Sequence, residues 1–237
     1  MEKNKINQFV QKYTLSGLVE SVKWEIVDNT LRTSFVSDDK SVLGNVSFSN
    51  FNFQNSVFGI YDTSILTKML NVLDNDIQFD VLENDNKPVS LQFKDKSTSV
   101  NYILADISVI PNVPNLKQFP KFDAKITLDQ NFINTFIKAK NALNDENNFT
   151  FIFKNNKAQT ILGYSNINTN RIYIDVNCEC EVDIKPISFS ATYLKEIFNA
   201  NRDATEATLK ISAEGLAHAN FKVNNFESNY YLVQLQS

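Results

Sequence analysis

Apolar residues recur along this chain at two spacings, one typical of helices and one typical of strands. Three segments share one helical pattern: an Asp or Ser, followed by apolar residues three, four, seven and eight positions later. An Asp or Ser there can cap a helix, and apolar residues at this spacing lie along one face of it. We therefore predict helices that follow Asp62, Asp129 and Ser190. A weaker copy near the amino terminus predicts a fourth helix, whose apolar face consists of Ile6, Phe9, Val10 and Tyr13.

The rest of the chain consists largely of short stretches rich in Val, Ile, Phe and Thr, separated by Asn and Asp. This pattern is typical of strands joined by turns. In the first half we predict strands at Val22–Asp28, Thr30–Val36, Leu43–Phe48, Ile77–Leu82, Val89–Phe93 and Ser99–Ala105. In the second half we predict strands at Phe149–Phe153, Ala158–Leu162, Arg171–Val176, Cys180–Ile184, Ala207–Ala213 and Tyr230–Leu235.

The segment between the two halves, Ser108–Asp123, holds three of the five prolines. Proline favours extended backbone and cannot donate a ladder hydrogen bond, so this segment is predicted to be a connector. Two of the four helices fall in each half, which indicates an internal duplication. The 237 residues are enough for two domains. We predict an α+β fold of two similar domains, 1–107 and 125–237, joined by the connector 108–124.

The polar faces of the four predicted helices carry neutral side chains and lysines, and Glu196 is their one acidic residue. A solvated helix face without a function would normally mix both signs of charge. The lysines best placed on these faces are Lys5, Lys12, Lys68, Lys138 and Lys195. Three further basic residues lie near helix ends, and an ideal helical wheel turns the second of them toward the apolar side: Lys3, Lys140 and Arg202.

Composition changes this picture in two ways. The chain has 23 Lys and Arg against 27 Asp and Glu, a net charge of −4, which by itself argues against a nucleic-acid partner. Segregated charge removes that objection, because acid-poor helices can face DNA while the carboxylates lie elsewhere. One histidine and five widely spaced glycines leave no phosphate-binding loop, dinucleotide fingerprint or nucleophile elbow. We therefore predict a protein that is not an enzyme and has no cofactor.

Few residues are candidates for a metal or acid–base site. Cys178 and Cys180 alternate on a predicted strand and are interpreted as packed thiols in a reducing, cytoplasmic compartment. Asp74 and Asp76 flank Asn75 in what is more often a turn than a catalytic pair. His218 is interpreted as a surface or turn histidine. These few residues do not make up a set of metal ligands, so no metal site is predicted. No apolar run reaches the roughly 18–20 residues of a membrane span, so no membrane partner is predicted.

Two local matches and one layout resemble the DNA sliding clamps of T-even-type bacteriophages. The first match is Val57-Phe58-Gly59-Ile60-Tyr61-Asp62, with Leu66, Leu73 and the turn Asp74-Asn75-Asp76. The second is Ala219-Asn220-Phe221-Lys222, followed by Asn229-Tyr230-Tyr231-Leu232-Val233. The connector, from Ala105-Asp106 through Pro111-Asn112 to Phe119-Pro120 and Ile126, is similar in layout to the strap between the domains of that family.

This resemblance implies a clamp fold with sheets outside and two helices per domain on the inner face. It implies that three subunits close head-to-tail around duplex DNA, and that the ring tethers a DNA polymerase and is loaded by a clamp-loader ATPase. The DNA contacts would be sequence-independent, through the lysines on the helix faces. Partner tails would bind in a groove beneath the connector, for which the apolar candidates are Val109, Ile110, Val113, Leu116 and Phe119.

Two other functions remain open from the residues alone. Strand aromatics such as Phe48, Phe51, Phe53 and Phe58 could form a stacking platform for single-stranded DNA, although they are dense enough to be core. A structural β-rich phage protein would explain the strands but not the acid-poor helix faces.

Overall fold

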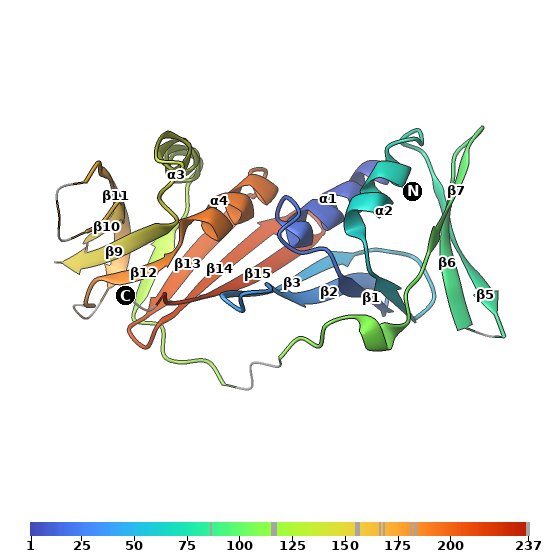
Figure 1. Ribbon diagram of the computed structural model, residues 1–237, viewed down its shortest axis with the longest axis horizontal. Coiled ribbons are helices and arrows are strands. Elements are labelled where there is room, and N and C mark those ends of the chain that lie inside the picture. The colour runs from blue at the N-terminus through green and yellow to red at the C-terminus, as the bar shows by residue number, and fades with distance from the viewer. Residues whose placement is uncertain are drawn as a thin grey trace. The chain divides into compact units, whose positions relative to one another are not determined.

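The computed structural model describes residues 1–85, 87–114, 118–154, 157–165, 167, 169–180, 182 and 184–235. The chain forms two compact units (Figure 1). Unit 1 consists of Met1–Phe35 and Asn45–Val113, and unit 2 consists of Val36–Gly44 and Pro114–Ser237. Each unit contains two helices and a large antiparallel sheet, in agreement with the predicted α+β fold of two similar domains.

The segment Val36–Gly44 comes from the first half of the chain but belongs to unit 2. The Tyr193 hydroxyl donates a hydrogen bond to the Asp39 carboxylate at 3.2 Å, and the Val233 amide donates to the Ser41 carbonyl at 2.9 Å. The predicted domain 1–107 included this segment. The sequence did not reveal that this segment packs with unit 2, because its placement depends on contacts between a hairpin tip and residues far away in the chain.

Unit 1 begins with a helix and ends with a 3-10 turn, η1 (Ile107–Val109). Its larger sheet has the strand order β4-β1-β2-β3, and a second sheet has the order β5-β6-β7. The helices are α1 (Lys3–Thr14) and α2 (Thr63–Leu70), which pack against each other. The strands are β1 (Val22–Val27), β2 (Thr30–Val36), β3 (Val42–Ser49), β4 (Ser56–Ile60), β5 (Gln78–Asn84), β6 (Lys87–Lys94) and β7 (Ser99–Ile103).

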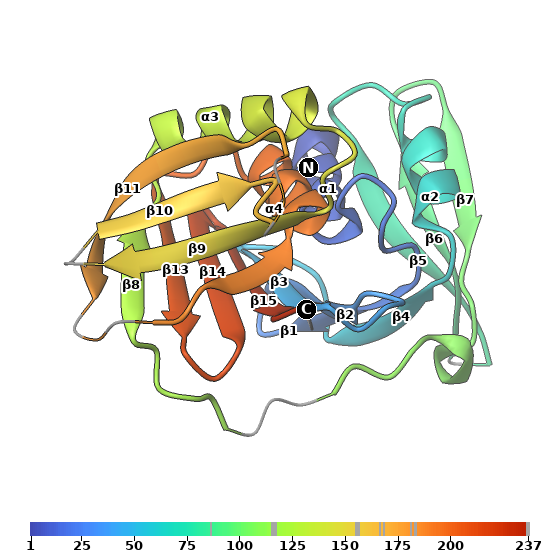
Figure 2. The same ribbon diagram turned by 60° about the vertical axis from the view of Figure 1, so that its left-hand side comes forward.

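Unit 2 also has two helices, but its strands form one continuous run in the order β12-β9-β10-β11-β8-β13-β14-β15. Its helices, α3 (Gln130–Ala142) and α4 (Ala191–Ala200), pack against each other, and α3 also contacts β11 (Figure 2). The strands are β8 (Ala124–Thr127), β9 (Asn148–Lys154), β10 (Lys157–Leu162), β11 (Ile172–Cys180), β12 (Ile187–Ser190), β13 (Glu206–Ser212), β14 (Leu216–Val223) and β15 (Phe226–Val233).

The three predicted capping residues begin three of the helices. Asp62 accepts a hydrogen bond from the Ile65 amide at 2.8 Å, and Asp129 accepts one from the Phe132 amide at 2.7 Å. Ser190 does the same for α4, at 3.3 Å. Each cap satisfies one of the amides that have no partner within the helix. Helix α1 is the weaker copy here too, because its N-cap residue, Glu2, makes no side-chain capping bond.

Aromatic side chains fill the core of each unit. In unit 1 the rings of Phe9, Tyr13 and Trp24 pack edge to face, and the Trp24 indole donates to the Tyr13 hydroxyl at 3.3 Å. Three of the four strand aromatics considered as a stacking platform belong to this core, because Phe48, Phe51 and Phe58 are each at most 5% exposed. The fourth, Phe53, is half-buried and packs against Phe79 with a ring-centroid distance of 4.8 Å. Buried rings cannot stack on bases, so Phe48, Phe51 and Phe58 do not form a platform for single-stranded DNA.

One predicted strand, Cys180–Ile184, is wrong. Strand β11 ends at Cys180, and the described residues Val182 and Ile184 lie outside any strand before β12 begins at Ile187. The alternating pattern continued past the real end of the strand, and the Cys180 thiol instead bonds to the Val182 carbonyl at 2.8 Å.

A carboxylate, Asp95, stabilises two loops of unit 1 at once. It accepts hydrogen bonds from the Asp74 amide at 2.8 Å, the Ser97 amide at 2.8 Å and the Thr98 amide at 2.6 Å. These amides hold the pKa of Asp95 below its ordinary value. The Asp74-Asn75-Asp76 segment is therefore a structural turn, as its sequence favoured.

We expect Asp95→Asn to lower the melting temperature by a few degrees at pH 7. The folded-state pKa is lowered, so the carboxylate contributes its stability above its unfolded pKa of about 3.9 and loses it as the pH falls through the folded value. The melting temperatures of wild type and Asp95→Asn should therefore differ at pH 7, and the difference should shrink as the pH is lowered through the folded-state pKa of Asp95. Thermal unfolding over an acid-to-neutral pH series measures this, and a pH-independent difference would contradict it.

Candidate nucleic-acid interface

The four helices are strongly positive in an otherwise acidic chain. Together they hold seven lysines and one glutamate, which gives them a net charge of +6, while the whole chain has −4. The acidic excess therefore lies on strands, turns and helix caps. This segregation was predicted from the sequence, and it makes the helix faces of both units the first candidate surface for a polyanion.

In unit 1, two of the three predicted lysines are accessible. Lys68 on α2 is exposed and forms no ion pair with any residue that the structure describes. Lys5 on α1 is about half exposed and pairs with Glu2 at 3.2 Å. Lys12 is 1% exposed, so it does not belong to the surface. The helical wheel placed it at the margin of the polar face, and tertiary packing then covered it.

In unit 2, Lys138 projects from the exposed face of α3 beside Asn131 and Asn134. It forms no ion pair within the described ranges. Lys195 on α4 is less accessible, with 24% of its side chain exposed, and its ammonium lies 3.4 Å from a Glu196 carboxylate oxygen.

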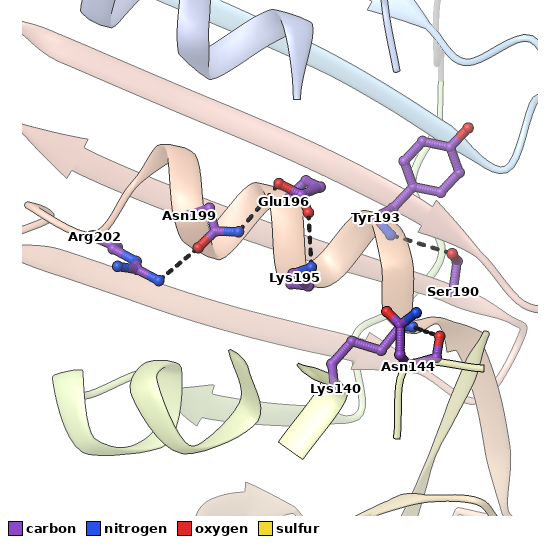
Figure 3. A network of polar contacts seen from close by, with 8 residues as sticks. All are labelled: Lys140, Asn144, Ser190, Tyr193, Lys195, Glu196, Asn199 and Arg202. Atoms are coloured by element: carbon purple, nitrogen blue, oxygen red, sulfur yellow. Dashed lines mark hydrogen bonds and ion pairs between the residues drawn. The ribbon is translucent and has the colours of Figure 1, made fainter. Parts of the chain in front are cut away.

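Glu196 links the two cationic residues of the α4 region, Lys195 directly and Arg202 through Asn199 (Figure 3). One carboxylate oxygen pairs with Lys195, and the other accepts a hydrogen bond from the Asn199 amide group at 3.2 Å. Asn199 in turn accepts a hydrogen bond from the Arg202 guanidinium at 2.8 Å. A phosphate that approaches Lys195 must compete with Glu196, so α4 offers a polyanion a weaker contact than α2 or α3. The sequence singled out Glu196 but did not reveal this network.

Lys140 is buried, as the helical wheel indicated, and its ammonium donates to the Asn144 carbonyl at 2.6 Å (Figure 3). Burial lowers the pKa of Lys140, and the neighbouring Lys195 ammonium lowers it further. Lys140 therefore stabilises the end of α3 and is not available to a ligand.

The predicted partner-groove residues have unequal exposure. Val109 is 57% exposed and Val113 is half-buried, both in unit 1. Ile110 is 3% exposed because it packs against β4, where a Cβ added at Gly59 would lie 3.4 Å from its side chain. Ile110 is therefore a core residue and not an open contact. Leu116 lies outside the described residues.

Phe119, the last predicted groove residue, lies in unit 2 and is 49% exposed. Its ring stacks on Tyr231 with a centroid distance of 5.1 Å. His218 stacks on the same Tyr231 at 4.5 Å, and its Nε2 lies 2.9 Å from the Asn229 side-chain oxygen. His218 is thus a half-buried residue within strand β14, so the turn alternative in its interpretation was wrong.

No group of three or more His, Cys, Asp or Glu in the described ranges has an arrangement that could hold a metal ion. Cys178 is half-buried and Cys180 is buried, both on β11. Burial raises the pKa of the Cys178 thiol, which keeps it protonated and unreactive. None of the helices described is both long and apolar enough to cross a membrane.

Comparison with known proteins places this geometry in a known fold. No family model and no curated protein sequence matches the chain. Among solved structures, the chain is similar to the Proliferating Cellular Nuclear Antigen of Entamoeba histolytica, with a TM-score of 0.77 and 16% sequence identity. The similarity covers 99% of this chain and 96% of that one. The chain therefore has the fold of a sliding clamp.

Proposed function

We propose that this protein is a DNA sliding clamp of the T-even bacteriophage type. Three copies join head-to-tail into a ring that encircles duplex DNA and tethers the replicative DNA polymerase. The ring acts in the cytoplasm of the infected bacterium, where a separate clamp-loader ATPase places it on DNA. It has no catalytic role of its own.

The charge segregation of the helices is the observation that carries this proposal. Lysines on a helix face attract the phosphate backbone without reading bases, and this attraction is independent of sequence. Exposed Lys68 and Lys138 supply it directly, while Lys5 and Lys195 contribute more weakly because each pairs with a glutamate. A ring held by topology needs only such weak contacts, and weak contacts permit sliding.

Each unit also has an open strand edge that suits a head-to-tail joint. In unit 1, β7 is the last strand of its sheet, and Ile103 at its end is 73% exposed. In unit 2, strand β11 pairs with β10 along one edge over Ile172–Asn177. Along its other edge the described pairings with β8 involve only Cys178–Cys180, so that edge is open over Ile172–Asn177. Tyr173 on that stretch is 53% exposed. Open edges readily accept a further strand, and two different patches generate a ring if the rotation closes.

The exposed residues of the connector are the proposed partner contacts. Val109 and Phe119 are large, apolar and about half exposed, which is the character expected for residues that anchor a short apolar tail. We propose each of them separately, Val109 in unit 1 and Phe119 in unit 2, as a contact for a partner tail, and we exclude the buried Ile110.

The decisive experiment compares retention on circular and linear DNA. The protein is assembled on a nicked circle and separated from free chains by gel filtration, and half of the sample is then linearised with a restriction enzyme. We expect retention on the circle and escape from the linear form. Light scattering without DNA should give about 81 kDa, three times the 27.0 kDa of one chain. Equal retention on both DNA forms, or a stable monomer, would contradict the proposal.

A further inference from the structure

Strand β5 has an outer edge along which none of the described strands pairs. It is one of the two edge strands of the small sheet β5-β6-β7, and the joint proposed above uses the other one, β7. In unit 2 the corresponding strand is β13, which follows α4 as β5 follows α2. Strand β8 covers the edge of β13 by pairing with Thr208–Ile211. Unit 1 therefore leaves open an edge that unit 2 covers.

The two edges of the small sheet present similar apolar side chains. Leu82 on β5 and Ile103 on β7 both pair with Ser90 on β6, so the three residues form one row on one face of the sheet. Leu82 is 39% exposed and Ile103 is 73% exposed. An open edge with an exposed apolar residue favours pairing with another chain. Without further features, β5 would therefore compete with β7 for a neighbouring strand.

The backbone just before β5 shows which of its groups face the open edge. The Ile77 amide donates to the Met1 carbonyl at 2.9 Å, and the Met1 amino group donates to the Ile77 carbonyl at 2.6 Å. Every second residue of a strand directs its amide and carbonyl to the same edge. The backbone groups of Phe79 and Val81 therefore face the open edge, and a further strand would bind to them.

The side chain of Asp80 occupies this edge. Its carboxylate accepts a hydrogen bond from the Val81 amide at 2.8 Å, which is one of the donors that an added strand would need. A further strand would have to displace the carboxylate and place its own carbonyl oxygens beside a negative charge. Asp80 is exposed, so the added strand would also remove this charge from water, at a cost in free energy.

The pairing of β5 with β6 is irregular directly beyond this point. Leu82 lies opposite Ser90, but Glu83 lies opposite Pro88, so Val89 has no partner on β5. A bulge of this kind increases the local twist, and bulges and charged residues are features that protect edge strands. The regular part of the open edge is therefore short, and Asp80 lies in the middle of it.

We propose that Asp80 blocks the β5 edge against a second copy of this chain, so that the small sheet joins a neighbour only through β7. The charges of the two strands support this, because β5 contains two acidic residues and no basic one, whereas β7 contains no charged residue. The inference rests on the proposed head-to-tail assembly for the role of β7. A ring closes only through matched patches, and a second open edge would link rings into larger assemblies.

The test compares Ile103→Glu alone with the double variant Asp80→Thr and Ile103→Glu. Ile103→Glu disables the β7 edge, so self-association of the double variant must use another surface. Light scattering over a concentration series should give 27.0 kDa for Ile103→Glu and a mass that rises toward twice this value for the double variant. Two β5 edges can pair symmetrically, which limits the product to a dimer. Thermal melting confirms that both variants are folded.

Hydrogen–deuterium exchange identifies the surface that associates. At concentrations that give the dimer, the amides of Gln78–Leu82 in the double variant should exchange more slowly than in Ile103→Glu. The amides of Ser99–Ile103 should exchange equally in both. A double variant that remains at 27.0 kDa, or that associates without protection of Gln78–Leu82, would overturn the proposal.

Glu83→Thr in the same Ile103→Glu background is the matched control. It makes the same change in net charge on the same strand, but Glu83 lies beyond the irregular pairing and is exposed. We expect this control to remain at 27.0 kDa. If it associates as strongly as the Asp80→Thr chain, net charge and not the carboxylate on the Val81 amide governs the edge, and the proposal is wrong.

The clamp proposal has a separate readout, which is the mass of the wild-type chain. A monomeric wild type would contradict the ring, whereas the difference between the two chains that carry Ile103→Glu reports only on Asp80. A wild type of about 81 kDa, three times 27.0 kDa, together with no effect of Asp80→Thr would contradict only the present inference. The two failures are therefore distinguishable.

Discussion

Replacing Lys68 and Lys138 together by glutamate is expected to abolish stable retention on nicked circular DNA. Each chain loses two accessible cations from its helix faces and gains two anions, and threefold repetition multiplies the change. Because binding strength depends steeply on the number of phosphates neutralised, affinity for linear duplex should fall by about 100-fold at about 50 mM salt. Anisotropy titrations over a salt series measure both the loss and the shallower salt dependence. Light scattering should still report the wild-type mass.

Two matched variants test whether the loss of DNA binding comes from the helix faces. Lys94→Glu with Lys222→Glu makes the same change in net charge on exposed strand positions, and should leave DNA binding nearly intact. Glu196→Gln frees Lys195 from its ion pair, so it should tighten binding and steepen the salt dependence. If the strand variant loses as much affinity as the helix variant, net charge and not the helix surface governs binding.

Ile103→Glu and Tyr173→Glu are each expected to reduce the assembly from about 81 kDa to the 27.0 kDa of a single chain. A charge placed on either open edge must be desolvated when the joint forms, and one defective patch per chain interrupts every joint of a ring. Light scattering at micromolar concentration measures this. Leu82→Glu, on the opposite edge strand of the same small sheet, is the control and should leave the mass unchanged.

Mixing the two variants gives a sharper result. A chain with Ile103→Glu keeps a sound β11 edge, and a chain with Tyr173→Glu keeps a sound β7 edge. One intact joint can therefore form between them, which should produce a species of about 54 kDa that cannot close. A joint that used the same patch on both copies would not show this complementation, and its absence would contradict the head-to-tail arrangement.

The fold was accessible to sequence reasoning because local signals agreed with the tertiary structure. Asp62, Asp129 and Ser190 cap helices whose apolar stripes are buried, so capping chemistry and the helical period identified the same elements. The two-domain α+β organisation followed from their repetition. Features that depend on contacts between distant segments were not accessible, and Val36–Gly44 is the clearest example.

The candidate site shows the same division. Lys68 and Lys138 were correctly placed on exposed helix faces, because exposure on a helix follows from periodicity. The burial of Lys12 and Ile110 depends on which residues pack over them. Neither a helical wheel nor the proline content of a segment carries that information.

The packing of Val36–Gly44 with unit 2 also affects how the connector contributes to holding the two halves of the chain together. The backbone passes between the two units three times, after Phe35, after Gly44 and after Val113. A protease that cut the connector would break the only covalent link between residues 1–113 and 114–237, but it would leave the hydrogen bonds of Asp39 and Ser41 to Tyr193 and Val233 intact. We therefore expect the two fragments to stay together until denaturing conditions break these contacts. The connector is thus the only covalent tether to residues 114–237 but not the only structural one, because the packed segment Val36–Gly44 also holds the first half of the chain to unit 2.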